Sequence, residues 1–544
     1  MRLKTAALVL SAAFAAVLSH PTAATFPSDD KSIVHVLYRV AFGGRPGDIE
    51  KVRQIGLQQY VERQLHPERI EDSALNARLA DFRTIAMTSR EISEQFEQPM
   101  MEARRERQRA AAAGADPDAQ PRRIDPAMQS IQQGANGVIV ELSEQKLLRA
   151  IYSERQLQEV LTDFWFNHFN VDARKGRDRF LLTEYERESI RPHVFGRFRE
   201  LLEATAKSPA MLFYLDNWLS ADPNGPHAPE RQSRAAGRNR GQFPGFPPRR
   251  NPARPGVGAS PAPQPPAAAN NRRNGLNENY ARELMELHTL GVDGGYTQKD
   301  VSEVARAFTG WTIDNPRRGG EFRFEERIHD AGEKTILGHR IKAGGGMSDG
   351  EEVLDILAAH PSTARFISTK LARRFVSDTP PPALVDRLAA RFRETNGDLR
   401  AVMTTLLMSP EFLAQEVYRA KVKTPFEFVV SAVRATGADL VEARPLVRAL
   451  QELGMPLYQC QPPTGYKDSA DAWTNTGALV GRMNFALTLA SGRRFAGDSA
   501  TWERAVESAL ADDLSDATRA TIAKANDAPQ RAALALGSPE FQKR

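Results

Sequence analysis

Apolar residues recur every three to four positions through most of this chain, and no other feature of the sequence constrains the fold as strongly. An α-helix turns once in about 3.6 residues, so this spacing gathers apolar side chains on one face. The strict alternation of β-strands is scarce. We therefore predict a mainly α, multi-helix globular body. Helices are expected at 48–65, 179–202, 277–290, 298–308, 351–359, 362–376, 383–394, 399–407, 425–435, 443–453, 476–490 and 501–510, and over 137–169 as one long helix or two joined end to end.

One segment has the pattern of a β-hairpin. Phe322, Phe324 and Glu326 alternate with other residues, and the turn-like sequence Asp-Ala-Gly follows at 330–332. Residues 335–337 then provide a return strand. We expect one short hairpin near 321–341.

A segment rich in arginine and proline interrupts the helical pattern between residues 227 and 274. It holds 10 of the 35 prolines, and nine arginines against one acid, Glu230. Such a composition buries too little apolar surface to offset the entropy lost on ordering, so we predict a disordered insert. The insert separates an N-terminal helical unit at 25–226 from a second helical unit at 275–492, which contains the hairpin. A C-terminal helical segment covers 493–544.

The net charge of +5 and the pI of about 9.2 resemble those of a nucleic-acid-binding protein. The insert alone carries +8, however, and Arg2 and Lys4 add +2. The rest of the chain therefore carries about −5, whereas a nucleic-acid-binding fold needs its basic residues on ordered elements. We predict no nucleic-acid partner.

Residues 1–24 have the layout of a secretory signal peptide. Arg2 and Lys4 precede an apolar run at 6–18, and small residues lie before Thr25. The run of about 13 residues is shorter than the roughly 20 that span a bilayer. We predict cleavage after Ala24, a periplasmic or secreted protein, and no transmembrane segment after cleavage. The single cysteine, Cys460, then leaves the fold without an intrachain disulfide.

The densest group of candidate catalytic side chains lies in the predicted helix 277–290. At about 100° per residue, Glu278, Arg282 and Glu286 fall within about 80° of one another, with Glu283 about 60° beyond. His288 projects roughly opposite Glu286, which does not fit a zinc motif of the His-Glu-x-x-His type. Two interpretations stay open. The residues form either a row of ion pairs (an ion ladder) along a helix that ends near residue 290, or a pocket whose carboxylates supply the general acid and the general base.

A second candidate segment is 163–171, in which polar residues lie among aromatic ones. Trp165 and His168 are three residues apart and share a helix face, while Asn167 and Asn170 share another. This pattern indicates a site wall or a buried polar network.

Two further clusters leave both a structural and a functional interpretation open. His329 and Asp330, with Lys334 nearby, fit either a turn with a supporting aspartate or part of a site. The predicted helix through 366–375 fits either a solvated face or a face toward an anionic ligand. Its basic residues are Lys370, Arg373 and Arg374.

We expect segments 163–171, 277–290 and the turn at 329–330 to meet around one polar centre. They hold a large share of the histidines beside carboxylates, and an unpaired buried carboxylate costs several kcal/mol. The candidate catalytic residues are Glu283, Glu286 and His168. The candidate binding residues are Trp165, Asn167, Glu278, Arg282, His288, Trp311, His329 and Asp330. No phosphate loop, dinucleotide fingerprint or zinc cysteine spacing occurs, so the cofactor and metal stay unknown.

Six motifs in this order resemble a known bacterial family, the domain of unknown function 1800. They are YRVAFGGRPGDIE, TDFWFNHF, NENYARELMELHTLGVDGGYTQKDVSEVARAFTGWT, HDAGEKTILG, ARFISTKLARRFV and MSPEF. The resemblance runs from about residue 32 to 492 and implies an exported, mainly helical protein. Genes of this family often neighbour those of an exported family resembling sulfatases and alkaline phosphatases. This chain departs in its Arg/Pro insert and in Gly465-Tyr466, where Gly-Trp is expected.

Two functions follow as hypotheses. The first is an envelope enzyme that acts on a polymeric or carbohydrate-like substrate through a carboxylate and histidine centre. The second is a noncatalytic assembly or binding partner of an exported sulfatase- or phosphatase-like protein. A deep cleft lined by Trp165, His168, Glu283 and Trp311 favours the enzyme, and a packed centre favours the partner.

Overall fold

The computed structural model describes residues 26–112, 126–225, 275–316 and 318–491, followed by 506, 510 and 513–544. The predicted signal peptide at 1–24 and the predicted insert at 227–274 lie outside the described residues. So does nearly all of the helix expected at 501–510.

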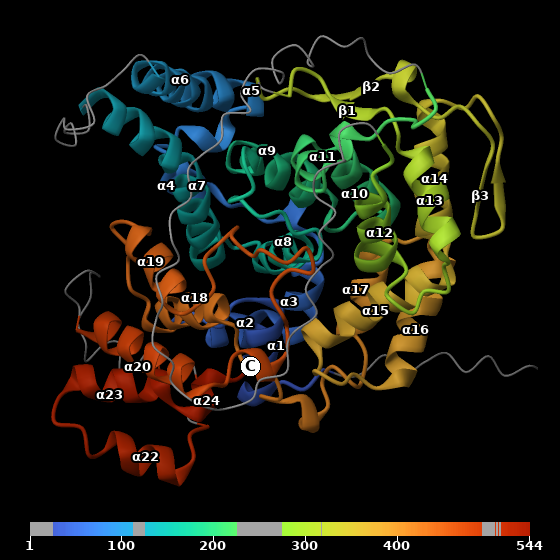
Figure 1. The fold of residues 1–544 in the computed structure, drawn as a ribbon. Helices are drawn as coiled ribbons and strands as arrows, with labels where there is room; N and C mark the ends of the chain where they lie inside the picture. Colours follow the sequence, from blue (N-terminus) through green and yellow to red (C-terminus); the bar gives the residue numbers. More distant parts are fainter. Residues whose placement is uncertain are drawn as a thin grey trace, which may run out of the picture.

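Helices dominate the described residues, which confirms the mainly α fold class (Figure 1). Those before residue 226 are α1 (Asp30–Val40), α2 (Asp48–Ile55), α3 (Leu57–Gln64), α4 (Ser73–Leu79), α5 (Ser89–Ile92), α6 (Gln98–Ala112), α7 (Pro126–Tyr152), α8 (Gln156–His168), α9 (Leu182–Glu184), α10 (Phe198–Ala206) and α11 (Pro209–Tyr214). Two π-helical turns, η3 (Ser93–Glu97) and η5 (Tyr185–Ile190), continue α5 and α9.

The second half of the chain is also helical. Its elements are α12 (Glu278–Glu283), the π-helical turn η8 (Leu284–Thr289), α13 (Gln298–Ala307), α14 (Met347–Ala359), α15 (Pro361–Phe375), α16 (Pro382–Glu394), α17 (Leu399–Leu407), α18 (Pro425–Thr436), α19 (Arg444–Glu452), α20 (Thr476–Ala490), α22 (Asp516–Ile522), α23 (Ala528–Gly537) and α24 (Pro539–Gln542). Short 3-10 turns join several of them.

Two of the predicted helices are broken where the backbone cannot continue. Gly56, with φ of 86°, separates α2 from α3, because a left-handed residue ends a helical run. The helix expected at 179–202 turns into a 3-10 segment that contains Pro192, and α10 begins only at Phe198. The expected pair within 137–169 is present as α7 and α8.

Four short strands form two antiparallel hairpins rather than the single pairing expected. Strand β1 (Trp311–Ile313) pairs with β2 (Phe322–Phe324), and β3 (Lys334–Ile336) pairs with β4 (His339–Ile341). A hairpin is therefore present near 321–341, but the pairing of 322–324 with 335–337 was wrong. Leu337 and Gly338 both have positive φ, as a tight two-residue hairpin turn requires, so β3 turns directly into β4.

One apolar cluster extends from Ile33 to Phe541, and helix α8 runs through its middle (Figure 1). On α8, Trp165 is 1% exposed, and its ring packs against Phe169 and Phe198. Trp311 on β1 is fully buried beside Phe308. Among the described helices, none combines the length and apolar character needed to span a membrane.

A short backbone bridge pairs residues 421–423 antiparallel with 542–544. The amide of Lys423 donates to the carbonyl of Gln542 at 2.9 Å, and that of Arg544 donates to the carbonyl of Lys421 at 2.8 Å. The side chain of Arg544 is buried and lies 2.9 Å from Glu427, which also pairs with Arg374 on α15. This bridge therefore ties α15, α18 and α24 together.

The two lysines of this bridge are equally buried, each 1% exposed, but have different surroundings. The amine of Lys421 lies 2.6 Å from Asp378 and 3.1 Å from Asp468. The amine of Lys423 lies over the rings of Tyr38 and Phe541, at 4.1 and 3.7 Å from their centroids, and has no hydrogen-bond partner among the described residues.

Candidate functional site

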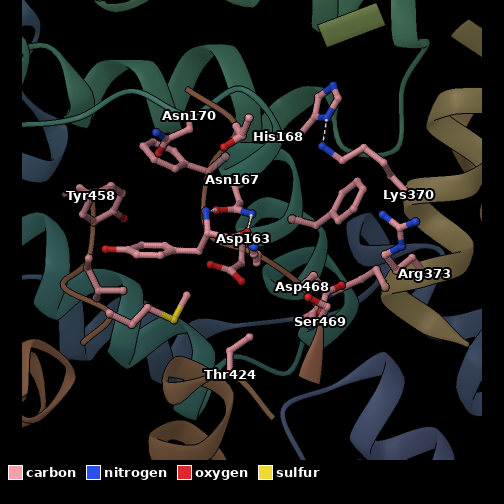
Figure 2. Close-up of a pocket in the computed structure, with 18 of the residues that line it drawn as sticks. Asp163, Asn167, His168, Asn170, Lys370, Arg373, Thr424, Tyr458, Asp468 and Ser469 are labelled. Atoms are coloured by element: carbon pink, nitrogen blue, oxygen red, sulfur yellow. Dashed lines mark hydrogen bonds between the residues drawn. The ribbon is translucent and has the colours of Figure 1, made fainter. Parts of the chain in front are cut away.

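A cavity of about 540 Å³ lies between the end of α8, the C-terminal half of α15 and the segment 455–469 (Figure 2). These three wall segments are far apart in sequence. The lining residues are Lys146, Asp163, Phe164, Phe166, Asn167, His168, Asn170, Lys370, Arg373, Arg374, Asp378, Thr424, Met455, Leu457, Tyr458, Thr464, Tyr466, Lys467, Asp468 and Ser469.

A lysine and a histidine meet in the wall of this cavity. The Nζ atom of Lys370 lies 2.8 Å from Nδ1 of His168 (Figure 2). The Nε2 atom of His168 lies 3.1 Å from the backbone carbonyl of His288. A carbonyl only accepts, so Nε2 carries the proton and Nδ1 accepts from Lys370. The carbonyl of His288 is free for this contact because η8 ends one residue later. The helix terminus thus fixes the tautomer of His168.

Burial changes the proton affinity of all three groups. Burial, reinforced by Arg373, lowers the pKa of Lys370 to about 8. Burial and then Lys370 hold the pKa of His168 well below its ordinary value. The same two causes, in the same order, lower the pKa of His288 to about 3. Near neutral pH both imidazoles are therefore neutral, and part of the Lys370 population is an unprotonated amine.

Two asparagines at the end of α8 hold the opposite wall. The amide of Asn167 donates to the carbonyl of Tyr466 at 2.8 Å, and the Tyr466 backbone amide donates back to Asn167 at 2.7 Å. Asn170 donates to the carbonyls of Cys460 and Pro462. Gly465 has φ of 73°, and an added Cβ would lie 2.2 Å from the carbonyl oxygen of Asn167, so only glycine fits there.

The charges of the lining do not cancel. Each acidic side chain already has a cationic partner: Lys146 lies 2.8 Å from Asp163, and Lys421 lies 2.6 Å from Asp378 and 3.1 Å from Asp468. Arg374 pairs with Glu427. Within the described part of the chain, three lining cations have no carboxylate within 4 Å. They are Lys370, Arg373 and Lys467.

Of the candidates predicted from sequence, Asn167 and His168 line the cavity, whereas Trp165 and Trp311 lie in the apolar core. The charged side chains of α12 and η8 contact the neighbouring helix α13 and the loop before it. Glu278 accepts from Gln298 and Ser302, Arg282 donates to Gln298, and Glu286 accepts from the hydroxyl of Tyr296. Among the described residues we find no ion pair within this group, so it links two helices and does not form a ladder.

Glu283 is the one member of that group with no hydrogen bond or ion pair within the described residues. Burial raises the pKa of Glu283 to about 7; the charge of Glu286 adds to the rise, and Arg282 opposes it. This carboxyl can therefore donate or accept a proton near neutral pH. It is not among the residues lining the cavity.

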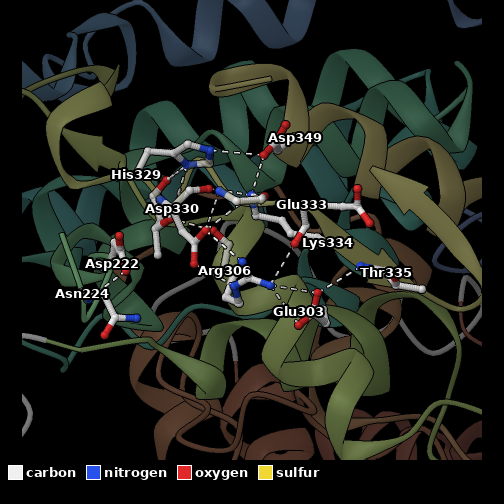
Figure 3. Close-up of polar contacts among 12 residues, drawn as sticks. Asp222, Asn224, Glu303, Arg306, His329, Asp330, Glu333, Lys334, Thr335 and Asp349 are labelled. Atoms are coloured by element: carbon white, nitrogen blue, oxygen red, sulfur yellow. Dashed lines mark hydrogen bonds and ion pairs between the residues drawn. The ribbon is translucent and has the colours of Figure 1, made fainter. Parts of the chain in front are cut away.

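His329 and Asp330 belong to a buried polar cluster (Figure 3). His329 contacts the carbonyl of Thr309 through Nδ1 at 2.8 Å and Asp349 through Nε2 at 3.3 Å. Lys334 lies 2.6 Å from Asp349, and Asp330 accepts two hydrogen bonds from Arg306.

The expected polar centre is therefore present in part. Segment 163–171 meets 277–290 through His168 and His288, whose rings lie 6.1 Å apart. The turn at 329–330 has its own partners on α13, β3 and α14, and no contact given for its side chains reaches α8 in the described chain. A search of the described residues finds no group of three or more histidine, cysteine, aspartate or glutamate side chains able to hold a metal ion.

The family to which this architecture belongs can be identified from a match over nearly the whole chain. The profile described as "Protein of unknown function (DUF1800)" matches residues 35–543. The chain belongs to this family. No curated protein and no solved structure matches the chain. Membership of the DUF1800 family therefore assigns no activity to the chain.

Several cavity residues were not singled out from sequence. Lys146 lies four residues after Leu142 and so on an apolar helix face, which is an unusual place for a cation and could have been noticed. Lys370 and Arg373 lie in the helix for which two interpretations were open, and the structure places both in the lining. Asp468 carries no local signal, and Tyr466 stands out in the sequence only as the departure from the expected Gly-Trp, because only the fold brings their loop to α8.

Proposed function

We propose that this DUF1800 protein is a cell-envelope enzyme that acts on an acidic, carbohydrate-like or polymeric substrate in the central cavity. The observation that carries the proposal is the uncompensated positive charge of Arg373 and Lys467, beside the amine of Lys370. Each acidic group of the lining lies within 4 Å of a cation, which weakens its repulsion of an anionic ligand.

The dimensions of the cavity suit a small ligand or one unit of a polymer. Its volume of about 540 Å³ lies within the range of roughly 300–1,000 Å³ that is usual for small-molecule sites. Phe164 and Tyr466 add aromatic surface to the polar groups of the lining. Such a mixture suits a sugar ring, which has apolar faces and polar edges.

The chemistry that we propose is proton transfer by Lys370. A base works best when its pKa lies near the working pH, and the pKa of Lys370 is lowered to about 8. His168 holds the amine by a single hydrogen bond and is a positioning residue. The location rests on the signal-like residues 1–24 and is part of the proposal.

A second candidate is the noncatalytic partner of an exported sulfatase- or phosphatase-like protein. The observation that favours it is the apolar surface of α20, where Leu479, Val480 and Leu487 are 47%, 56% and 44% exposed. Such side chains are common where proteins dock. In this case the cavity would bind an acidic group without changing it.

The test is a ligand and product screen with the full mature protein. Oligosaccharides of uronic acids, sulfated sugars and phosphorylated sugars are compared with neutral sugars of the same size, by calorimetry and by mass spectrometry of the products. We expect acidic ligands to bind more tightly, and Arg373→Ala and Lys467→Ala to weaken binding by about tenfold each, or about 1.4 kcal/mol. Lys299→Ala, an exposed cation on α13 outside the cavity, is the matched control.

Two results would contradict the proposal. Equal affinity for acidic and neutral sugars would remove the role of the cations, and binding without product would favour the partner function.

A further inference from the structure

The amine of Lys370 stands apart from the other cations in the cavity lining. Its polar contact among the described residues is Nδ1 of His168, at 2.8 Å, and the ring of Phe366 lies 5.5 Å from it. Lys146, in the same lining, instead lies 2.8 Å from the carboxylate of Asp163. A carboxylate holds a lysine in its charged form, whereas a neutral imidazole does so weakly. The cavity lining thus contains one lysine that is paired with a carboxylate and one whose amine is suited to react.

From this geometry we propose that Lys370 forms an imine with the carbonyl carbon of an acidic aldehyde or 2-oxo acid bound in the cavity. The inference deepens the proposed function and rests on it, because Arg373 and Lys467 would hold the acidic group of the same ligand. It also specifies the ligand class: an anion with a reactive carbonyl group, such as an open-chain acidic sugar.

The hydrogen bonds around Lys370 leave its nitrogen free to attack. A neutral amine has two N–H groups and one lone pair. Because the one proton of His168 points at the carbonyl of His288, the imidazole can only accept from Lys370. One N–H of the amine is therefore used, and the lone pair faces no donor from His168. The lowered pKa of Lys370, about 8, supplies the unprotonated form.

The reaction balances without any further reagent. The lone pair of Nζ attacks the carbonyl carbon, and the π electrons of the C=O bond move to its oxygen. The resulting carbinolamine loses this oxygen as water, which takes with it the two protons that the amine carried. A C=N bond replaces the C=O bond, and nothing is oxidised or reduced. The open-chain sugar or oxo acid would thereby be held covalently, with His168 as a positioning residue.

The test uses pyridoxal 5′-phosphate, an anionic aldehyde, as the probe on the full mature protein. Pyridoxal, the same aldehyde without the phosphate, is the matched control reagent. Imines are reduced with borohydride and located by peptide mass spectrometry, and binding is measured in parallel by calorimetry. We expect Lys370 to be modified in preference to Lys146 and the exposed Lys299, and pyridoxal to react about tenfold more slowly. Modification should rise through a pH of about 8.

Two variants keep the test decisive. Lys370→Arg retains the charge and should bind the probe but form no adduct at this position, because a guanidinium is not a nucleophile. His168→Ala admits water beside the amine, so the pH midpoint of labelling should move upward toward that of an ordinary lysine. A purely structural role of His168 would change the melting temperature and leave this midpoint unchanged.

The outcomes separate this inference from the function on which it rests. Tight binding of pyridoxal phosphate without an adduct on Lys370 overturns the imine and leaves the anion site standing. Equal labelling by the two aldehydes supports the imine and overturns the anion site. Preferential labelling of Lys299 or Lys146 contradicts the imine as well.

Discussion

Replacing Lys423 with methionine should make the protein more stable, although the change removes a charged residue from the centre of the fold. Lys423 is 1% exposed, and its amine lies over the rings of Tyr38 and Phe541 with no hydrogen-bond partner among the described residues, although Glu427 and several arginines act on it from a greater distance. Burial holds the pKa of Lys423 well below its ordinary value. The backbone contacts of this residue, to Gln542 and Arg482, are not affected by the substitution.

The magnitude follows from the proton that the amine must lose. Each pH unit between the working pH and the ordinary pKa of about 10.4 costs about 1.4 kcal/mol, so the cost at pH 7 has a ceiling of roughly 4–5 kcal/mol. Cation–π attraction to two rings returns on the order of 2 kcal/mol if the amine stays charged. Methionine keeps the apolar contacts and adds sulfur–aromatic ones. We therefore expect a gain of about 1–3 kcal/mol.

The pH dependence gives a second signature. Because the pKa of Lys423 is lowered in the folded state, the unfolded chain binds more protons at neutral and mildly alkaline pH. The stability of the wild-type protein therefore rises with pH until about 10.4, where the unfolded lysine also loses its proton. The variant lacks this slope. Its advantage should be largest at the acidic end of the range measured and should shrink toward pH 10.

Lys421→Met is the matched control, because Lys421 is equally buried and lies two residues away. Its removal takes the lysine partner from both Asp378 and Asp468, and leaves Asp468 with only the longer contact to Arg544, at 3.7 Å. Both carboxylates are partly exposed, so we expect a loss of about 1–2 kcal/mol. Thermal unfolding midpoints and urea unfolding, measured from pH 6 to 10, compare the two variants with the wild type. A loss of stability in Lys423→Met as large as that in Lys421→Met would refute the reasoning.

Three further changes have defined outcomes. Burial raises the pKa of Glu283 to about 7, so the stability that its protonated form contributes is present below pH about 4.5 and is lost as the pH rises through 7. Glu283→Gln should remove this loss of stability, which we expect to be about 1 kcal/mol after solvent screening. Unfolding curves recorded from pH 4 to 8 measure it. Gly465→Ala should lower the free energy of unfolding by about 2 kcal/mol or more and should reduce ligand affinity, because the added Cβ would overlap the carbonyl of Asn167. The control Gly477→Ala, at an exposed position, should change neither quantity. Burial raises the pKa of Cys460 to about 11, so iodoacetamide should alkylate the native protein at pH 8 far more slowly than the urea-unfolded chain; equal rates would contradict this burial.

Local patterns were sufficient to predict most helices but not their contacts. Helices α17 and α20 have the bounds that their apolar spacing predicts. The angular placement of His288 relative to Glu286 assumed an α-helix, whereas both residues lie in the π-helical turn η8, in which each residue turns less. The choice between strand partners depended on the turn at Leu337 and Gly338, which the alternation of Phe322 and Phe324 does not encode.

The candidate site was predictable only in the parts that lie close in sequence. The segment containing Asn167 and His168 was recognised from its polar residues among aromatic ones. Its partners, Lys370 and Tyr466, are 202 and 299 residues from the side chains that they contact. Such contacts are decided by packing of the whole chain, which one sequence without relatives does not reveal. For the same reason, the sequence alone did not show that the acidic side chains of the cavity are paired with cations, whereas some of its basic side chains have no carboxylate partner.

The separation of the cavity walls along the chain sets an order of events during biosynthesis. Asp163 belongs to the first wall and segment 455–469 to the last, so nearly 300 residues lie between them. At the usual rates of translation the last wall emerges roughly 15–60 seconds after the first. Until it arrives, the cavity beside Lys370 lacks one of its three walls. The cavity, and with it the reactive amine that we propose, is therefore complete only when the last third of the chain has folded.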